Sequence, residues 1–167
     1  MNNIEVLKQH NIFITESKEK FQDMSIAPMH TCEHIINRTM VNLFGCGRAV
    51  SAHIERKKSK LDFALSQALS EDDIARIETT VNEVIARHLP VTTEFITQEE
   101  ATGRFDMKRL PEGASETVRV VHVGDYDECL CIGQHVENTS EIGTFKIISS
   151  VLRILAILTT LATIPSF

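Results

Sequence analysis

The chain has 167 residues, enough for one domain with a buried core and too few for several. Its formal net charge of −6 argues against a protein that coats nucleic acid with a broad basic surface, although a small contact with one RNA end stays compatible. Four cysteines and no signal peptide at the start are typical of a reducing cytoplasm, where thiols pack in the core or bind metal.

The first 28 residues are mixed in character and are treated as an N-terminal segment without an assigned structure. From Thr31 to Phe44 the apolar residues recur at helical spacing, and Gly45 is a natural stop, so this stretch predicts a helix. Its first turns contain the sequence HTCEH. His30 and His34 would lie one turn apart, about 40° around the axis, and both rings could reach one metal ion.

The middle of the chain predicts two strands, a long helix and a third strand. Residues 48–54 and 60–65 have strand character and are joined by a basic turn that begins ERKKS. Ser70 followed by Asp73 is a variant of a capping box, and the apolar series from Ile74 to Ile85 predicts an amphipathic helix that ends before Pro90. Further along, residues 91–96 predict a strand and 98–105 a short helix.

The last third is rich in strand signals. Residues 117–123 and 128–132 predict two strands with GDYD as the turn, and residues 144–148 and part of the apolar tail supply the last strands. Because the strands come in short-turn pairs, we predict an α+β fold in which helices pack on one face of an antiparallel-rich sheet.

The predicted main domain covers residues 29–150, and residues 151–167 form an apolar tail that packs on it. The most apolar run, residues 151–164, is 14 residues long and contains Arg153. A bilayer span takes roughly 20 apolar residues, so we expect no membrane contact.

A second histidine-containing pair lies in CIGQH, where Cys131 and His135 are four residues apart and Gly133 permits a tight turn. One thiolate and three imidazoles form a tetrahedral set that suits zinc better than magnesium or calcium. The predicted zinc ligands are therefore His30, His34, Cys131 and His135, although each pair alone could equally be core or surface. Cys129 would share a strand face with Cys131 and is either a core residue or a substitute ligand.

HTCEH also matches the H-x-x-E-H pattern of inverted zinc peptidases, in which Glu33 would be the general base. Such enzymes need a third, acidic ligand from a later helix and a larger domain around a substrate cleft. Neither is apparent in this sequence, so this alternative is the more distant one.

The block ETVRVVHVGDYDECLCIGQHVENTSEIGTFKI, residues 116–147, resembles the C-terminal part of the editing domain shared by alanyl-tRNA synthetases and free-standing AlaX-type proteins. It is more distantly similar to the editing domain of threonyl-tRNA synthetase. HTCEH, the KSKLDF strand and SEDDIARIETTVNEVI follow in the order that the family shows. The resemblance places the family's metal ligands on the four residues named above.

This resemblance implies an enzyme that acts in trans at the acceptor end of an aminoacylated tRNA. It would hydrolyse the ester of a misacylated tRNA, with seryl-tRNA(Ala) as the expected substrate and glycyl-tRNA(Ala) as a second candidate. The family usually has C-G-G-T-H-V and T-G-E-I-G where this chain has CIGQHV and TSEIG. These differences leave an alternative function, a zinc-containing RNA-binding or structural module derived from an editing domain.

Two further assignments depend on the resemblance. Ser51, on the strand after the first helix, is the nearest candidate for a hydroxyl that recognises the substrate, and is otherwise an ordinary solvent-facing residue. The basic cluster of Arg56, Lys57, Lys58 and Lys60 is a candidate contact for the phosphates of the acceptor end, and is otherwise a solvated turn.

Overall fold

The computed structural model describes residues 23–107, 116–153 and 157–163. In chain order the elements are η1 (Met24–Ile26), α2 (Ala27–Phe44), β1 (Ser51–His53), β2 (Lys58–Ala64), α3 (Glu71–Ala86), β3 (Val91–Thr97), α4 (Gln98–Thr102), β4 (Thr117–Val123), β5 (Asp127–Leu130), η3 (Thr139–Glu141), β6 (Lys146–Arg153) and β7 (Ile157–Thr163).

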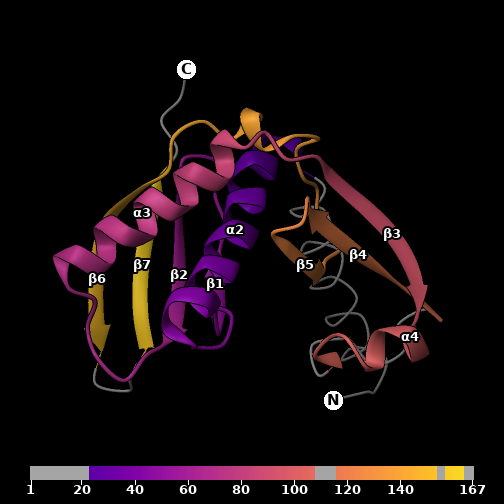
Figure 1. The fold of residues 1–167 in the computed structure, drawn as a ribbon, viewed down its shortest axis with the longest axis horizontal. Coiled ribbons are helices and arrows are strands. Elements are labelled where there is room, and N and C mark those ends of the chain that lie inside the picture. Colours follow the sequence, from indigo (N-terminus) through magenta and orange to yellow (C-terminus); the bar gives the residue numbers. More distant parts are fainter. Residues whose placement is uncertain (1–22, 108–115, 154–156, 164–167) are drawn as a thin grey trace, which may run out of the picture.

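The strands form two antiparallel sheets. One has four strands in the order β1-β2-β7-β6, and the other has three in the order β3-β4-β5. In Figure 1, α3 crosses in front of the four-stranded sheet, and α2 runs between that sheet and the three-stranded one. The predicted α+β class is confirmed, and the antiparallel strands divide into two sheets that the sequence did not separate.

The two long helices have the caps that their sequences indicate. α2 begins at Ala27, ahead of the predicted start, because Pro28 fits the first turn of a helix, where its missing N–H costs nothing. It ends at Gly45, which adopts the left-handed conformation with φ 62° and donates its N–H to Val41. At the start of α3, Ser70 and Asp73 form the predicted capping box.

The main core lies between the two long helices and the four-stranded sheet. α2 contributes Cys32, which is fully buried, together with its neighbours Ile35, Ile36 and Met40. α3 contributes Ile77 and Val81, and β2 contributes Leu61 and Phe63. This core fixes the side of α2 from which the two histidines project.

The predicted apolar tail contributes strands to the four-stranded sheet. β6 crosses the predicted boundary between residues 150 and 151, and β7 lies between β2 and β6 and pairs with both. None of the helices in the described part of the chain is long and apolar enough to cross a membrane. The predicted division at residues 28 and 150 remains a prediction.

Candidate metal centre

Four side chains from two distant segments meet between α2 and the loop after β5. His30 and His34 come from the first turns of α2, whereas Cys131 and His135 come from the loop. One nitrogen or sulfur atom from each lies within 4.8 Å of all the others. The structure thus brings together the four residues that the sequence nominated as ligands.

The sulfur of Cys131 lies at the meeting point of the imidazole rings. Its Sγ is 3.3 Å from Nε2 of His30 and 3.4 Å from Nε2 of His135. The ring of His135 stacks on His30 at 4.2 Å between centroids and meets His34 edge to face at 4.6 Å. Both α2 histidines are buried, and Cys131 and His135 are partly exposed, so solvent reaches the cluster from the loop side.

The hydrogen bonds on the far side of two rings define their tautomers. Nδ1 of His30 lies 3.1 Å from the carbonyl oxygen of Gln134, which can only accept, so this nitrogen carries the hydrogen. The Thr31 hydroxyl donates to the carbonyl of Ala27 and therefore accepts from Nδ1 of His135, at 3.1 Å, and from the N–H of Val136. Nε2 is then the nitrogen of each ring that faces the sulfur.

The protonation states favour a cation at this point. Burial raises the pKa of Cys131, but its contacts with His135, His30 and His34 outweigh burial and lower the pKa to about 2. Burial lowers the pKa of His135 to about 4, so this ring is neutral at pH 7. One thiolate and three imidazoles, each able to offer a nitrogen lone pair to a metal ion, form the kind of donor set that zinc takes, and the residues present therefore fit the metal.

His34 is bordered by a carboxylate that the sequence analysis missed. Its Nδ1 is the one buried side-chain nitrogen or oxygen in the described residues without a hydrogen bond, and Oδ2 of Asp127 lies 3.5 Å away. Burial lowers the pKa of His34, but Asp127 and Cys131 outweigh burial and raise it well above its usual range. A proton on His34 and a metal cation at the centre thus compete, and metal binding would release that proton.

Asp127 was predicted to lie in the GDYD turn, but it begins β5 and is buried. It accepts hydrogen bonds from Arg38 and Arg48, which precede it by 89 and 79 residues. Burial raises its pKa, but His34 and Arg48 outweigh burial and lower the pKa to about 2, so the carboxylate is ionised. Spacing could not reveal this residue, because its partners are remote and share no periodic pattern with it.

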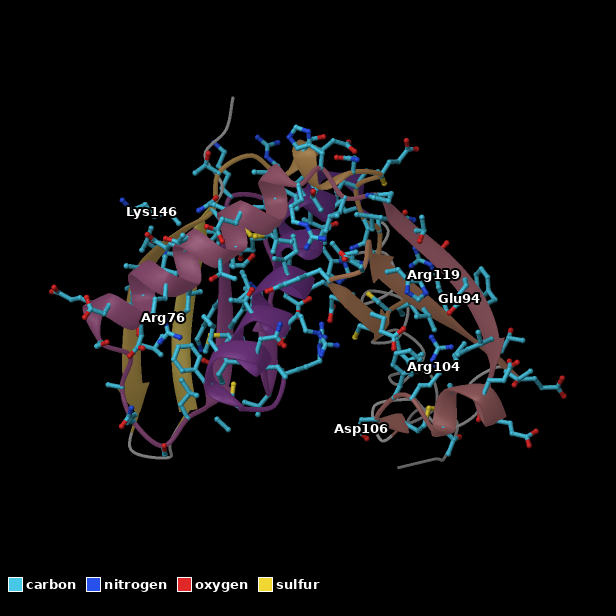
Figure 2. All side chains as sticks on the ribbon, in the orientation of Figure 1. Arg76, Glu94, Arg104, Asp106, Arg119 and Lys146 are labelled. Atoms are coloured by element: carbon cyan, nitrogen blue, oxygen red, sulfur yellow. The ribbon has the colours of Figure 1, made fainter. Side chains whose placement is uncertain are left out.

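The loop that carries Cys131 is tied to the three-stranded sheet. Arg119 on β4 donates from Nη1 to the carbonyl oxygens of Cys131, at 3.2 Å, and Gly133, at 2.6 Å, and its own carbonyl accepts from the N–H of Cys131 (Figure 2). Ile132, between them, is 61% exposed. The loop is therefore fixed by its backbone while one apolar side chain faces solvent beside the cluster.

Comparison with known proteins relates the sequence of this chain to one family. Residues 118–155 match the family described as "Threonyl and Alanyl tRNA synthetase second additional domain". The alanine–tRNA ligase of Fervidobacterium nodosum is 41% identical over 121 residues, covering 72% of this chain and 14% of the ligase. That of Caldicellulosiruptor saccharolyticus is 34% identical over 148 residues, covering 87% of this chain and 16% of the ligase.

The chain belongs to the editing-domain family of alanyl-tRNA synthetases. It spans 14% to 16% of the length of these two ligases, so the likeness concerns one region of each.

The remaining predicted residues of this editing domain lie outside the four-residue cluster. Ser51 is exposed on β1, where its hydroxyl donates to Asp62 at 2.6 Å. The basic cluster lies on the β1–β2 hairpin, with Arg56, Lys57 and Lys58 exposed and Lys60 3.4 Å from Asp62.

Glu33 and Cys129 are also absent from the four-residue cluster. Glu33 hydrogen-bonds through Oε1 to the Asn37 amide, one turn further along α2, and its Oε2 is 3.8 Å from Nε2 of His34. The second half of the cluster consists of a thiol and an imidazole, where an inverted zinc peptidase would need an acidic ligand from a later helix. The donor set therefore favours the editing assignment over the peptidase.

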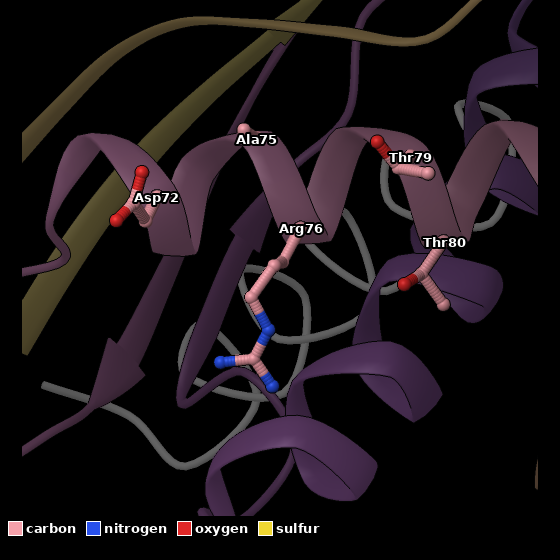
Figure 3. A pocket seen from close by; sticks show the side chains of 5 residues that line it. All are labelled: Asp72, Ala75, Arg76, Thr79 and Thr80. Atoms are coloured by element: carbon pink, nitrogen blue, oxygen red, sulfur yellow. The ribbon is translucent and has the colours of Figure 1, made fainter.

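A hollow on the surface of the editing domain contains none of the four cluster residues. It runs along α3 and is lined by Asp72, Ala75, Arg76, Thr79 and Thr80 (Figure 3). The hollow is open and has no thiol or imidazole at its edge, so the chemistry points to the cluster between α2 and the loop.

Proposed function

We propose that the chain is an aminoacyl-tRNA deacylase that acts in trans. It binds the acceptor end of a misacylated tRNA and hydrolyses the ester, with seryl-tRNA(Ala) as its main substrate and glycyl-tRNA(Ala) as a second one. The observation that carries the proposal is the convergence of His30, His34, Cys131 and His135 in a chain of the editing-domain family.

Zinc is the proposed metal, held by these four residues. A zinc ion there would supply a Lewis acid able to orient the ribose and amino group at the end of the substrate. Four protein ligands close a zinc site, which favours a positioning role for the metal over activation of water. Cys131 and His135, which are partly exposed, and the exposed Ile132 leave the loop side as the approach for the substrate.

Discrimination between serine and alanine esters needs a group that recognises the extra hydroxyl. A site that hydrogen-bonds a substrate hydroxyl rejects the analogue without it by about 10⁴-fold or more. Ser51 is the proposed group: its hydroxyl hydrogen goes to Asp62, which leaves its lone pairs to accept a hydrogen bond from the serine side chain.

The decisive experiment measures deacylation of seryl-, glycyl-, alanyl- and threonyl-tRNA by the purified chain. We expect kcat/KM for seryl-tRNA(Ala) to exceed that for alanyl-tRNA(Ala) by about 10⁴-fold, and Ser51→Ala to reduce this ratio. If a zinc-loaded chain binds these tRNAs but cleaves none of their esters, the enzyme assignment fails and the non-catalytic RNA-binding module takes its place.

The basic cluster on the β1–β2 hairpin is the proposed contact for the tRNA phosphates. Reversing the charges with Lys57→Glu and Lys58→Glu should weaken tRNA binding and reduce the slope of log K against log salt concentration by about 2. Filter binding at several salt concentrations measures both quantities.

The matched control carries the same charge change elsewhere on the surface, with Arg76→Glu on α3 and Lys146→Glu on β6, both exposed (Figure 2). Equal loss of binding in the two double variants would mean that only net charge matters. In that case the hairpin has no specific role in tRNA binding.

A further inference from the structure

Two of the three histidines of the cluster have the same arrangement of contacts, and His34 differs from them. In His30 and His135, Nε2 lies near the sulfur of Cys131 and Nδ1 is paired with a neutral oxygen, from Gln134 and Thr31 respectively. In His34, Nδ1 faces the carboxylate of Asp127 at 3.5 Å. His34 is thus the one ring of the three whose Nδ1 faces a charged group.

Two arginines hold the carboxylate of Asp127 in place. Arg48 makes a two-point contact with it, from Nη1 to Oδ1 at 2.7 Å and from Nη2 to Oδ2 at 3.0 Å, and Arg38 donates from Nε to Oδ1 at 2.9 Å. The carboxylate side chain is fully buried. Such a fork fixes both oxygens in one plane, so Oδ2 cannot turn away from the imidazole.

The two carboxylate oxygens of Asp127 accept different numbers of hydrogen bonds. Oδ1 accepts from both arginines, whereas Oδ2 accepts from Arg48 alone among the described residues and keeps a lone pair on the side of His34. A hydrogen bond from a nitrogen to this oxygen needs a separation of about 2.9 Å, so a ring shift of roughly half an ångström would complete it.

We propose that Asp127 is a positioning residue for the metal centre. It accepts the Nδ1–H of His34, holds the ring in the tautomer that presents Nε2 to the ion, and strengthens this nitrogen as a ligand. Carboxylate partners of metal-bound histidines act in this way, and their loss lowers metal affinity by about 10- to 100-fold. The inference rests on the proposed function only in requiring that the four cluster residues bind a metal.

The test compares Asp127→Asn with Asp125→Asn, a matched change two residues earlier. Asp125 is 75% exposed and pairs with Arg87, so it should not affect the cluster. In Asp127→Asn the amide NH₂ must face either an arginine N–H or the His34 N–H, donor against donor. Zinc affinity is measured by competition with a chromophoric chelator, and the ligand field by the visible spectrum of the Co²⁺ form.

We expect Asp127→Asn to bind zinc about 10- to 100-fold more weakly than the wild type and to shift the d–d bands of bound Co²⁺. The thiolate-to-cobalt band should persist, because Cys131 still binds the metal. Asp125→Asn should match the wild type in all three measurements. Wild-type zinc affinity and an unchanged cobalt spectrum in Asp127→Asn would overturn the proposal.

A second variant covers the case in which Asp127→Asn does not fold, which thermal unfolding would reveal. Arg38→Gln removes one support of Asp127 and leaves the fork of Arg48 in place, and Arg38 is already 32% exposed. It should fold and bind zinc several-fold more weakly, and unaltered zinc affinity would then count against the proposal.

Different results would refute the proposed function and the proposed role of Asp127. A wild-type chain that binds no zinc removes the metal centre and this role of Asp127 with it. A wild-type chain that binds zinc but cleaves no ester refutes the deacylase alone, and the two aspartate variants still decide the role of Asp127.

Discussion

Replacing Cys131 with alanine is expected to abolish stoichiometric zinc binding and, with it, deacylation of seryl-tRNA(Ala). The sulfur lies within 3.4 Å of two imidazole nitrogens, and its thiolate supplies the negative charge of the donor set. Loss of this charge should weaken zinc binding by more than roughly 100-fold, which is the most that loss of a hydrogen-bond partner of a metal-bound histidine usually costs. Metal analysis of the purified protein and single-turnover deacylation measure the two effects.

The matched control is Cys129→Ala, which removes a thiol two residues earlier, on β5 and outside the cluster. This variant should keep one zinc per chain and near wild-type deacylation. A zinc ion bound by Cys131→Ala at wild-type affinity would contradict the ligand assignment. Loss of zinc in Cys129→Ala would instead indicate that Cys129 is the substitute ligand considered in the sequence analysis.

Removing the hydroxyl of Thr31 is expected to reduce both stability and zinc affinity. The side chain is fully buried, and its oxygen accepts from Nδ1 of His135 and from the N–H of Val136. Thr31→Val keeps the shape but leaves both donors without a partner, which should cost about 2 to 4 kcal/mol in the free energy of unfolding. Zinc affinity should fall by about 10- to 100-fold because the ring of His135 loses the bond that orients it.

Thr39→Val separates the two effects. Thr39 is equally buried on the same helix, and its hydroxyl contacts Ile35 and Tyr126. This variant should lose about 1 to 2 kcal/mol of stability and no zinc affinity. Chemical denaturation of the metal-free proteins and chelator competition measure the two quantities, and equal zinc affinity in both variants would refute the role of Thr31.

The features that the sequence could predict are those with a local pattern. The helical spacing around His30 and His34 located one half of the site, and Cys131 and His135 at four-residue spacing located the other. The capping box at Ser70 marked the start of α3, because a cap is formed by neighbours in the chain. Each of these signals is contained within a few residues.

The features that the sequence could not predict depend on contacts between distant segments. Alternation identified strands, but their assignment to two sheets depends on β7 pairing with β2, far away in the chain. Thr31 looked like an ordinary helix residue, and Arg119 like one member of a strand. Their roles arise only when the loop after β5 folds against α2 and β4.

The place of β7 in the four-stranded sheet has a consequence for biosynthesis. β7 is an inner strand of that sheet, yet it is the last of the described strands to leave the ribosome. Until it emerges, the edge of β2 that it will cover presents unpaired backbone groups. We therefore expect nascent chains that stop before Ile157 to be held by chaperones or to aggregate, since an open strand edge of this kind attracts other chains.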